Sequence, residues 1–292
     1  MRETVISDEV PGHPMRIGDS FTALHWSEDF FAGAVDPVVM VDHFHMTAAT
    51  FPPHPHAGIS AVTYVFEDSA SPHVNYDSLG NHQPIHPGAL HWFVAGRGAV
   101  HTEQPEGPGA HVHALQIFVN LPASKKHLTP CAVHLEPAEI PEYTAPGVRV
   151  RVVLGQSQGL AQPATARLPE PFTLLDGFLE AGAAFGHSLP AAWSAMVCLV
   201  SGRVDVEVAG RRVPLSEGHA IGITRPGQAT EAGLPLRVLA QGGPAHWVLL
   251  SGPALREPLV KQGPFVMNTL EQMRESIASY QQGLFGQLRW PG

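Results

Sequence analysis

The chain has 292 residues, of which 44% are apolar and 15% are charged, and its formal net charge is −9. This length suits one large or two ordinary domains, and the apolar content excludes a globally disordered chain. The sequence has no Lys/Arg-rich run to match a phosphate backbone, so we expect no direct nucleic-acid partner.

The setting expected for the protein is the cytoplasm. Cys131 and Cys198 are the only cysteines, which is too few for a disulfide framework. The first residues lack the apolar core of a signal peptide. No apolar run reaches the roughly 18 residues that cross a bilayer, so we expect no membrane association.

Short β-strands joined by tight turns are predicted for most of the chain. The 29 glycines and 28 prolines favour such turns over long helices. Runs rich in β-branched and aromatic residues indicate strands. They fall, in chain order, at residues 15–18, 38–44, 61–66, 90–94, 114–122, 149–155 and 196–202. Residues 129–146 carry several prolines and little periodicity, and we interpret them as a linker.

The most informative stretch runs from His54 to Glu103. It begins with His54-Pro55-His56 and ends with His101-Thr102-Glu103. Because side chains two residues apart share one face of a strand, each pair of ligands should point the same way. If the two strands are neighbours, three imidazoles and one carboxylate converge. The sequence therefore predicts a metal site made of His54, His56, His101 and Glu103.

This interpretation has to be weighed against chance. The chain contains 18 histidines, and His43-Phe44-His45 and His111-Val112-His113 are further His-x-His pairs. The stretch from His54 to Glu103 stands out because two ligand pairs flank it and the second ends in a carboxylate. Its nitrogen and oxygen donors suit Fe(II), Mn(II), Ni(II), Cu(II) or Zn(II) rather than an iron–sulfur cluster.

The second half of the chain repeats the pattern of the first without its ligands. Residues 196–202 resemble 62–67, and residues 214–223 resemble 84–93, which indicates a duplicated β-barrel. We place the domains at 1–135 and 136–292. His187 stands alone where the first half has its His-x-His pair, so we expect one metal site in the two barrels and none in the second barrel.

The C-terminus is predicted to form a helix. Asn268 is the expected N-cap, with Glu271 three residues later as in a capping box. An apolar stripe at helical spacing should pack on a barrel, and Gly283 should end the helix. The stripe consists of Leu270, Met273, Ile277 and Tyr280.

Several of these segments together resemble the pirin family. The segments are residues 51–56, 62–65, 77–81, 95–103, 115–122, 256–258 and 263–269. The resemblance implies a double cupin fold, that is, two jelly-roll barrels with a C-terminal helix. It also implies an N-terminal barrel that binds iron through His54, His56, His101 and Glu103, and a C-terminal barrel without metal. Nickel, manganese, copper and zinc are the alternatives to iron.

Two positions depart from the family pattern. The family usually has a basic residue after the second histidine, where this chain has Ala57, and an acid four positions after that histidine, where it has Ser60. Neither residue is one of the four ligands. We expect both positions at the mouth of the pocket, where they would influence the choice of substrate.

Two functions from different classes follow from the resemblance. The first is an oxidoreductase of the quercetin 2,3-dioxygenase type, acting on a flavonol or a similar enolisable aromatic molecule, with Glu103 as both ligand and proton acceptor. The second is an iron-dependent, redox-sensing partner of other proteins, such as a transcription factor or a metabolic enzyme.

Overall fold

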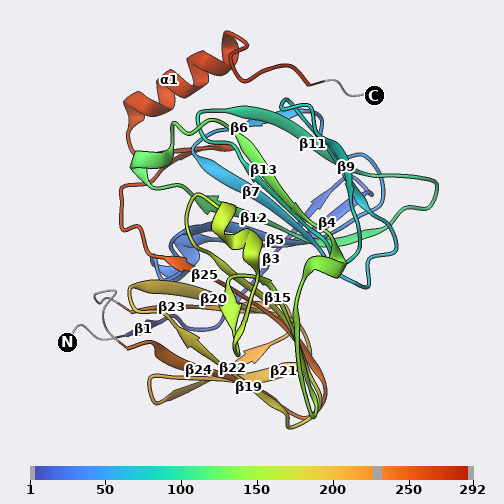
Figure 1. The fold of residues 1–292 in the computed structure, drawn as a ribbon, viewed down its shortest axis with the longest axis vertical. Coiled ribbons are helices and arrows are strands. Elements are labelled where there is room, and N and C mark those ends of the chain that lie inside the picture. The colour runs from blue at the N-terminus through green and yellow to red at the C-terminus, as the bar shows by residue number, and fades with distance from the viewer. Residues whose placement is uncertain (1–3, 226–231, 289–292) are drawn as a thin grey trace. The chain divides into compact units, whose positions relative to one another are not determined.

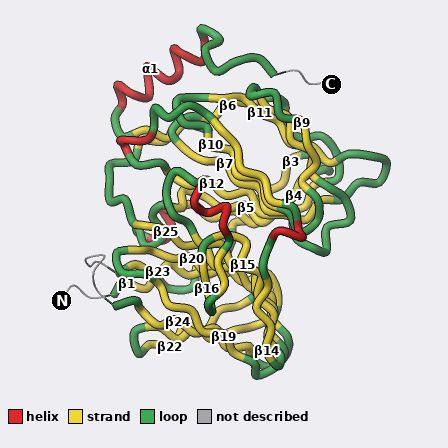
Figure 2. Tube along the Cα trace, in the orientation of Figure 1, coloured by secondary structure: helices red, strands yellow, loops and turns green. Residues whose placement is uncertain are grey.

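The computed structural model describes residues 4–225 and 232–288. Most of its regular structure is β-strand, and α1 (Leu270–Gln281) is the only α-helix among these residues (Figures 1 and 2). The predicted all-β class with a C-terminal helix is confirmed. None of the described helices is long and apolar enough to cross a membrane.

The described chain separates into two compact units, and each is assembled from segments that are distant in sequence. The first unit comprises the described parts of residues 14–25, 40–137 and 255–292. The second unit comprises the described parts of residues 1–13, 26–39 and 138–254. This division differs from the single boundary between residues 135 and 136 that we expected, because segments near both termini pair with strands far along the chain.

The first unit contains a larger and a smaller antiparallel sheet. Across the larger sheet the strands are β13 (Cys131–Leu135), β10 (Leu90–Val94), β7 (Ile59–Val65), β12 (Val112–Asn120), β5 (Val38–Met46), β4 (Phe21–Ser27) and β3 (His13–Ile17). Across the smaller sheet they are β6 (His54–His56), β11 (Ala99–Pro105), β8 (His73–Asp77) and β9 (His82–Ile85). The short strands β26 (Val260–Gln262) and β27 (Phe265–Met267) pair with each other.

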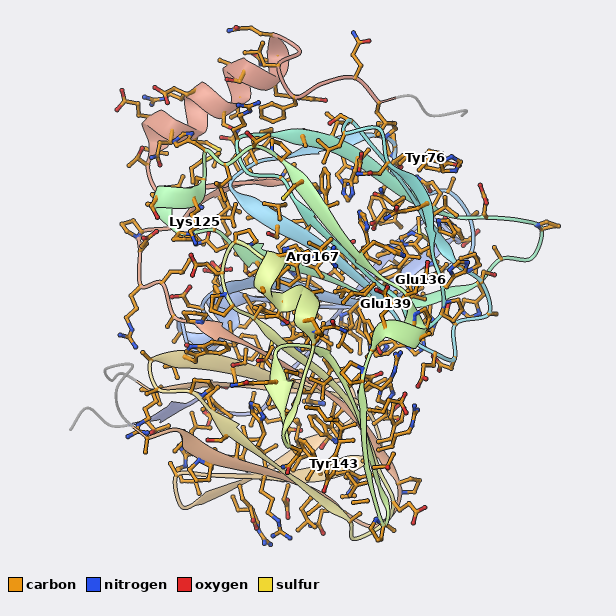
Figure 3. The ribbon with its side chains drawn as sticks, in the orientation of Figure 1. Tyr76, Lys125, Glu136, Glu139, Tyr143 and Arg167 are labelled. Carbon is orange, nitrogen blue, oxygen red and sulfur yellow. The ribbon has the colours of Figure 1, made fainter. Side chains whose placement is uncertain are left out.

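Apolar side chains from both sheets meet in one buried cluster. Phe44 and Val65 come from the larger sheet, and Ile85 comes from the smaller one. The two sheets therefore face each other across a shared core, which side chains fill (Figure 3). The arrangement is the expected jelly roll, formed by two sheets that face each other without closing into one continuous barrel.

The second unit repeats this architecture. Across its larger sheet the strands are β1 (Val5–Ile6), β23 (His219–Thr224), β20 (Trp193–Ser201), β25 (Ala245–Pro253), β18 (Thr173–Leu179), β15 (Val148–Leu154) and β14 (Glu142–Ala145), with β2 (Val10–Pro11) also paired to β23. Its smaller sheet contains β19 (Ala184–Leu189), β24 (Leu234–Ala240), β21 (Arg203–Val208) and β22 (Arg211–Ser216). A further pair is β16 (Gln156–Ser157) with β17 (Leu160–Ala161). Short 3-10 helices lie at Glu28–Phe31, Ala123–Lys125, Pro137–Glu139 and Pro163–Arg167.

Residues 129–146 are not the linker that we expected. They contain β13, which pairs along its full length with β10, and β14, which pairs with β15. The alternation that identifies a strand is present but brief. Val133 and Leu135 are buried, while the residues between and before them are not. Because the run is short and prolines flank it, the sequence pattern does not indicate a strand here.

The C-terminal helix begins one residue later than expected. Thr269 is the N-cap, and its side chain and that of Gln272 form the capping box. Asn268 instead donates its side-chain N–H to Glu257 Oε2 and to the Pro258 carbonyl. The stripe is only partly buried, because Leu270 is 63% exposed and Tyr280 is 38% exposed. Met273 packs with Phe265 and Phe285, which anchors α1 on the first unit.

Candidate metal site

Strands β6 and β11 bring the predicted histidines together. They pair antiparallel, with His54 opposite His101 and His56 opposite Ala99. The chain reaches β11 through Gly98, whose φ of +135° suits glycine and whose absent side chain leaves room for the ring of Phe285. This register places the three imidazoles on the same face of the smaller sheet.

The three imidazoles converge to metal-binding distance. Each of His54, His56 and His101 offers a ring nitrogen, and these nitrogens all lie within 4.8 Å of one another. The Nε2 atoms of His56 and His101 are 2.9 Å apart. Two imidazole nitrogens on adjacent positions of one divalent ion are separated by about 3 Å at ordinary metal–nitrogen distances. The spacing therefore fits a shared ion.

The protonation state of the cluster also suits ligation. His54 Nδ1 lies 2.9 Å from the Pro52 carbonyl, to which it donates, and this leaves the lone pair of Nε2 for a metal. Burial, together with the neighbouring imidazoles, holds the pKa of His56 and of His101 well below the usual value. The rings are neutral at neutral pH, as metal ligands must be.

Glu103 lies beside the three imidazoles but does not join their cluster. Its carboxylate Oε2 accepts a hydrogen bond of 2.5 Å from Thr63 Oγ1 and lies 3.7 Å from His73 Nδ1. Burial raises the pKa of Glu103 to about 7, the hydrogen bond from Thr63 lowers it, and the charge of Asp77 raises it. The structure thus brings together three of the four predicted ligands and holds the fourth at the wall of the same cavity.

The cavity itself has a volume of about 130 Å³. It is lined by the three clustered histidines and Glu103, and otherwise by Phe21, Met40, Asp42, Phe44, Met46, Phe51, His73, Gln116 and Phe118. His56 and His101 are buried, whereas His54 is partly exposed, as are Met40, Asp42, Phe51, Gln116 and Phe118 of the lining. Sequence reasoning missed His73 and Gln116, since neither belongs to a recognisable ligand spacing.

Ala57 and Ser60 do not lie at the mouth of this cavity, which corrects our expectation. Both are fully buried, and neither lines the cavity. Ala57 forms a bridge with Phe265, so the C-terminal segment covers the position. Ser60 lies on β7 between β10 and β12. A basic or acidic side chain at either position would be packed inside the unit.

The second unit contains the larger cavity, of about 1510 Å³, but its chemistry differs. His187 lines it, and His187 Nδ1 lies 3.1 Å from Ser157 Oγ. Among the described residues, His187 belongs to no group of ligands that converge on one point. We therefore take the clustered donors of the first unit, rather than cavity size, as the basis for the candidate site.

Comparison with known proteins gives family matches in both halves of the chain. The Pirin family model matches residues 14–119, and the Pirin C-terminal cupin domain model matches residues 174–286. Pirin from Mus musculus is 34% identical over 251 residues, which are 84% of this chain and 81% of that protein.

Two solved structures share the fold. Quercetin 2,3-dioxygenase from Acinetobacter baumannii superimposes with a TM-score of 0.82 at 24% identity, covering 98% of this chain and 99% of that one. The bacterial pirin YhhW from Escherichia coli, in complex with nickel(II), gives a TM-score of 0.60 at 17% identity over 86% of this chain and 99% of that one. The family models cover most of the residues and the sequence relatives agree with them, so this chain belongs to the pirin family.

Proposed function

We propose that the chain is an iron-dependent dioxygenase of the quercetin 2,3-dioxygenase type. The observation that carries the proposal is the convergence of His54, His56 and His101 at the wall of a partly apolar cavity that also holds a buried carboxylate. The three histidines would hold the ion, and Glu103 would be its fourth protein ligand. A bound iron supplies a redox-active centre with positions open to substrate and oxygen.

The cavity indicates the substrate class. Its volume of about 130 Å³ is close to that of an engineered apolar cavity of about 150 Å³ that takes up benzene. One aromatic ring therefore fits beside the histidines. Phe44 and Phe118 offer apolar surface for such a ring. A flavonol would present the edge that bears its acidic hydroxyl to the histidines, with the rings that exceed the cavity extending towards solvent.

Glu103 is the residue proposed to handle the substrate proton. Without a metal, burial raises the pKa of Glu103 to about 7, and a carboxylate in so poorly solvated a place is a suitable proton acceptor near neutral pH. Thr63 donates its hydroxyl hydrogen to Oε2, which fixes the orientation of the carboxylate. Oε1 is left to face the cavity or an ion. Thr63 is in this account a positioning residue.

Replacing Glu103 tests its proposed role as the proton acceptor. We expect iron-loaded protein, given oxygen and quercetin after anaerobic loading, to consume the flavonol absorbance in an iron-dependent reaction. Glu103→Gln should lower the rate by about 100-fold or more, the range for loss of a general base. Thr63→Val should lower it less and shift the acidic limb of the pH profile.

The iron content of each variant, measured on the same samples, shows whether a lost rate reflects lost metal. Flavonol loss that needs no iron, or that persists in Glu103→Ala, would refute the dioxygenase assignment.

A second function is favoured by one structural link. Ala57, next to the ligand His56, accepts a hydrogen bond of 3.0 Å from the Val266 backbone N–H. The same segment leads into α1, whose residue Leu270 is largely exposed. A change at the ligands would therefore reach a surface helix, as a redox-sensing protein partner requires. Identical protein partners captured by Fe(II)-loaded, Fe(III)-loaded and metal-free bait would contradict this function.

A further inference from the structure

A second group of histidines lies on the first unit, outside the cavity. His43 and His45 come from β5, His113 comes from the start of the neighbouring strand β12, and His111 immediately precedes that strand. Along both strands the alternate residues Phe44, Met46, Val112 and Ala114 are buried in the core between the sheets. The four histidines are therefore on the opposite face of the larger sheet, away from the cavity.

The rings of this group are close enough to share an ion. Ring nitrogens of His43, His45 and His113 all lie within 4.8 Å of one another. His43 Nε2 and His113 Nε2 are 2.7 Å apart, and His45 Nδ1 is 3.1 Å from His111 Nε2. Nitrogens on one tetrahedral zinc ion are about 3.3 Å apart at ordinary bond lengths. Small side-chain rotations would open the shorter contact to that spacing.

Asp68 forms a hydrogen bond with His113, in the way that a carboxylate supports a histidine that binds a metal. Its Oδ1 lies 2.7 Å from His113 Nδ1. A carboxylate accepts hydrogen bonds, so His113 carries its proton on Nδ1 and presents a lone pair on Nε2, towards His43. Carboxylates that orient a ligating histidine in this way are typical of zinc sites.

We propose that His43, His45 and His113 form a second site for a divalent transition-metal ion, with Asp68 as the orienting carboxylate and His111 at its edge. Imidazole donors suit zinc, copper and nickel, and zinc is the probe of choice because it has no redox chemistry. This site is independent of the one in the cavity, because its histidines come from β5 and β12 of the larger sheet. The histidines of the cavity come from β6 and β11 of the smaller sheet.

Another histidine group on the same unit provides a matched control. Glu136, labelled in Figure 3, lies 3.1 Å from His86 Nδ1 and 3.3 Å from His134 Nε2. Its carboxylate forms a hydrogen bond with one nitrogen of each ring, and the group does not converge as a metal cluster among the described residues. His86→Gln therefore removes an imidazole beside a carboxylate without touching either site.

The test is zinc binding by untagged, chelator-stripped protein, followed by equilibrium dialysis and elemental analysis. Wild-type protein and His86→Gln should bind two equivalents per chain. The double variant His56→Ala with His101→Ala should retain one equivalent, and His45→Gln with His113→Gln should lose that one and keep the other. The two double variants thus report on the two sites separately, so loss of zinc from the cavity does not affect the test of the second site.

Two single variants at exposed positions guard against misfolding as an explanation. His45→Gln should weaken the second equivalent at least tenfold, and Asp68→Asn should weaken it by about 10- to 100-fold, the usual cost of losing an orienting carboxylate. The proposal is overturned if zinc binding by His45→Gln with His113→Gln matches wild type at every concentration, or if the His56→Ala with His101→Ala protein binds no zinc.

Discussion

His56→Ala and His101→Ala should each purify as soluble, folded protein that has lost the iron of the cavity. Only two imidazoles would remain near the ion, in competition with water, so we expect iron affinity to fall by more than about 100-fold. The fold should persist because the first unit has a core of its own, with Phe44, Val65 and Ile85 shared between its sheets. Iron content and thermal melting are the measurements.

His187→Ala is the matched control in the second unit. His187 is a buried histidine at the wall of a cavity, like the ligands, but belongs to no converging group among the described residues. Its iron content should equal that of wild-type protein. If His187→Ala halved the iron, or if His101→Ala kept it, the assignment of the site to the first unit would be wrong.

Cys198→Asp should prevent folding. Cys198 lies on β20 between β23 and β25, is 3% exposed and has an apolar setting that raises the pKa of its thiol well above the usual value. The residues directly opposite Cys198 on the two neighbouring strands, Ala220 and Val248, are also buried. A carboxylate there costs several kcal/mol, whether it stays ionised or takes up a proton, and native domains are stable by only about 5–15 kcal/mol.

Cys131→Asp is the control for this substitution, because Cys131 is exposed at the start of β13. The control should express and melt almost like wild-type protein, whereas Cys198→Asp should be insoluble or lack a cooperative melting transition. A soluble Cys198→Asp protein with a wild-type melting temperature would mean that β20 is not buried as described.

Part of the histidine cluster could be predicted from the sequence because strand geometry is local. Alternation alone puts His54 and His56 on one face, but the pairing of β6 with β11 is long-range, and we assumed it before the structure showed it. The position of Glu103 could not be predicted in the same way. Thr63 holds its carboxylate from β7, and a hydrogen bond between different sheets leaves no trace in the spacing of residues.

Long-range pairing explains the other differences. The sequence repeat predicts two units, but it does not show that β1 and β2 pair with β23 or that residues 255–292 join the first unit. The burial of Ala57 follows from the same C-terminal segment. The group of His43, His45 and His113 was attributed to chance pairs for the same reason, since only the adjacency of β5 and β12 brings them together.

Acid should act on both the metal and the fold, in that order. Burial lowers the pKa of His73 to about 4 and that of His91 to about 3, so between about pH 6.5 and 4 the unfolded chain binds more protons than the folded one. Stability is therefore lost as the pH falls through this range. The free energy of unfolding is several kcal/mol, so the fold survives the first part of this loss, whereas protons compete directly with the metal for the imidazole ligands. Metal should therefore leave before the protein unfolds.

The most direct test of the central claim is bound iron and circular dichroism measured on the same samples from neutral pH downward, after excess iron has been removed. The account predicts that iron leaves reversibly, with a midpoint at higher pH than the loss of β-sheet signal, and that His101→Ala shows only the second transition. Coincident loss of both signals, or iron that stays bound until the fold is lost, would contradict a metal held for chemistry by His54, His56 and His101.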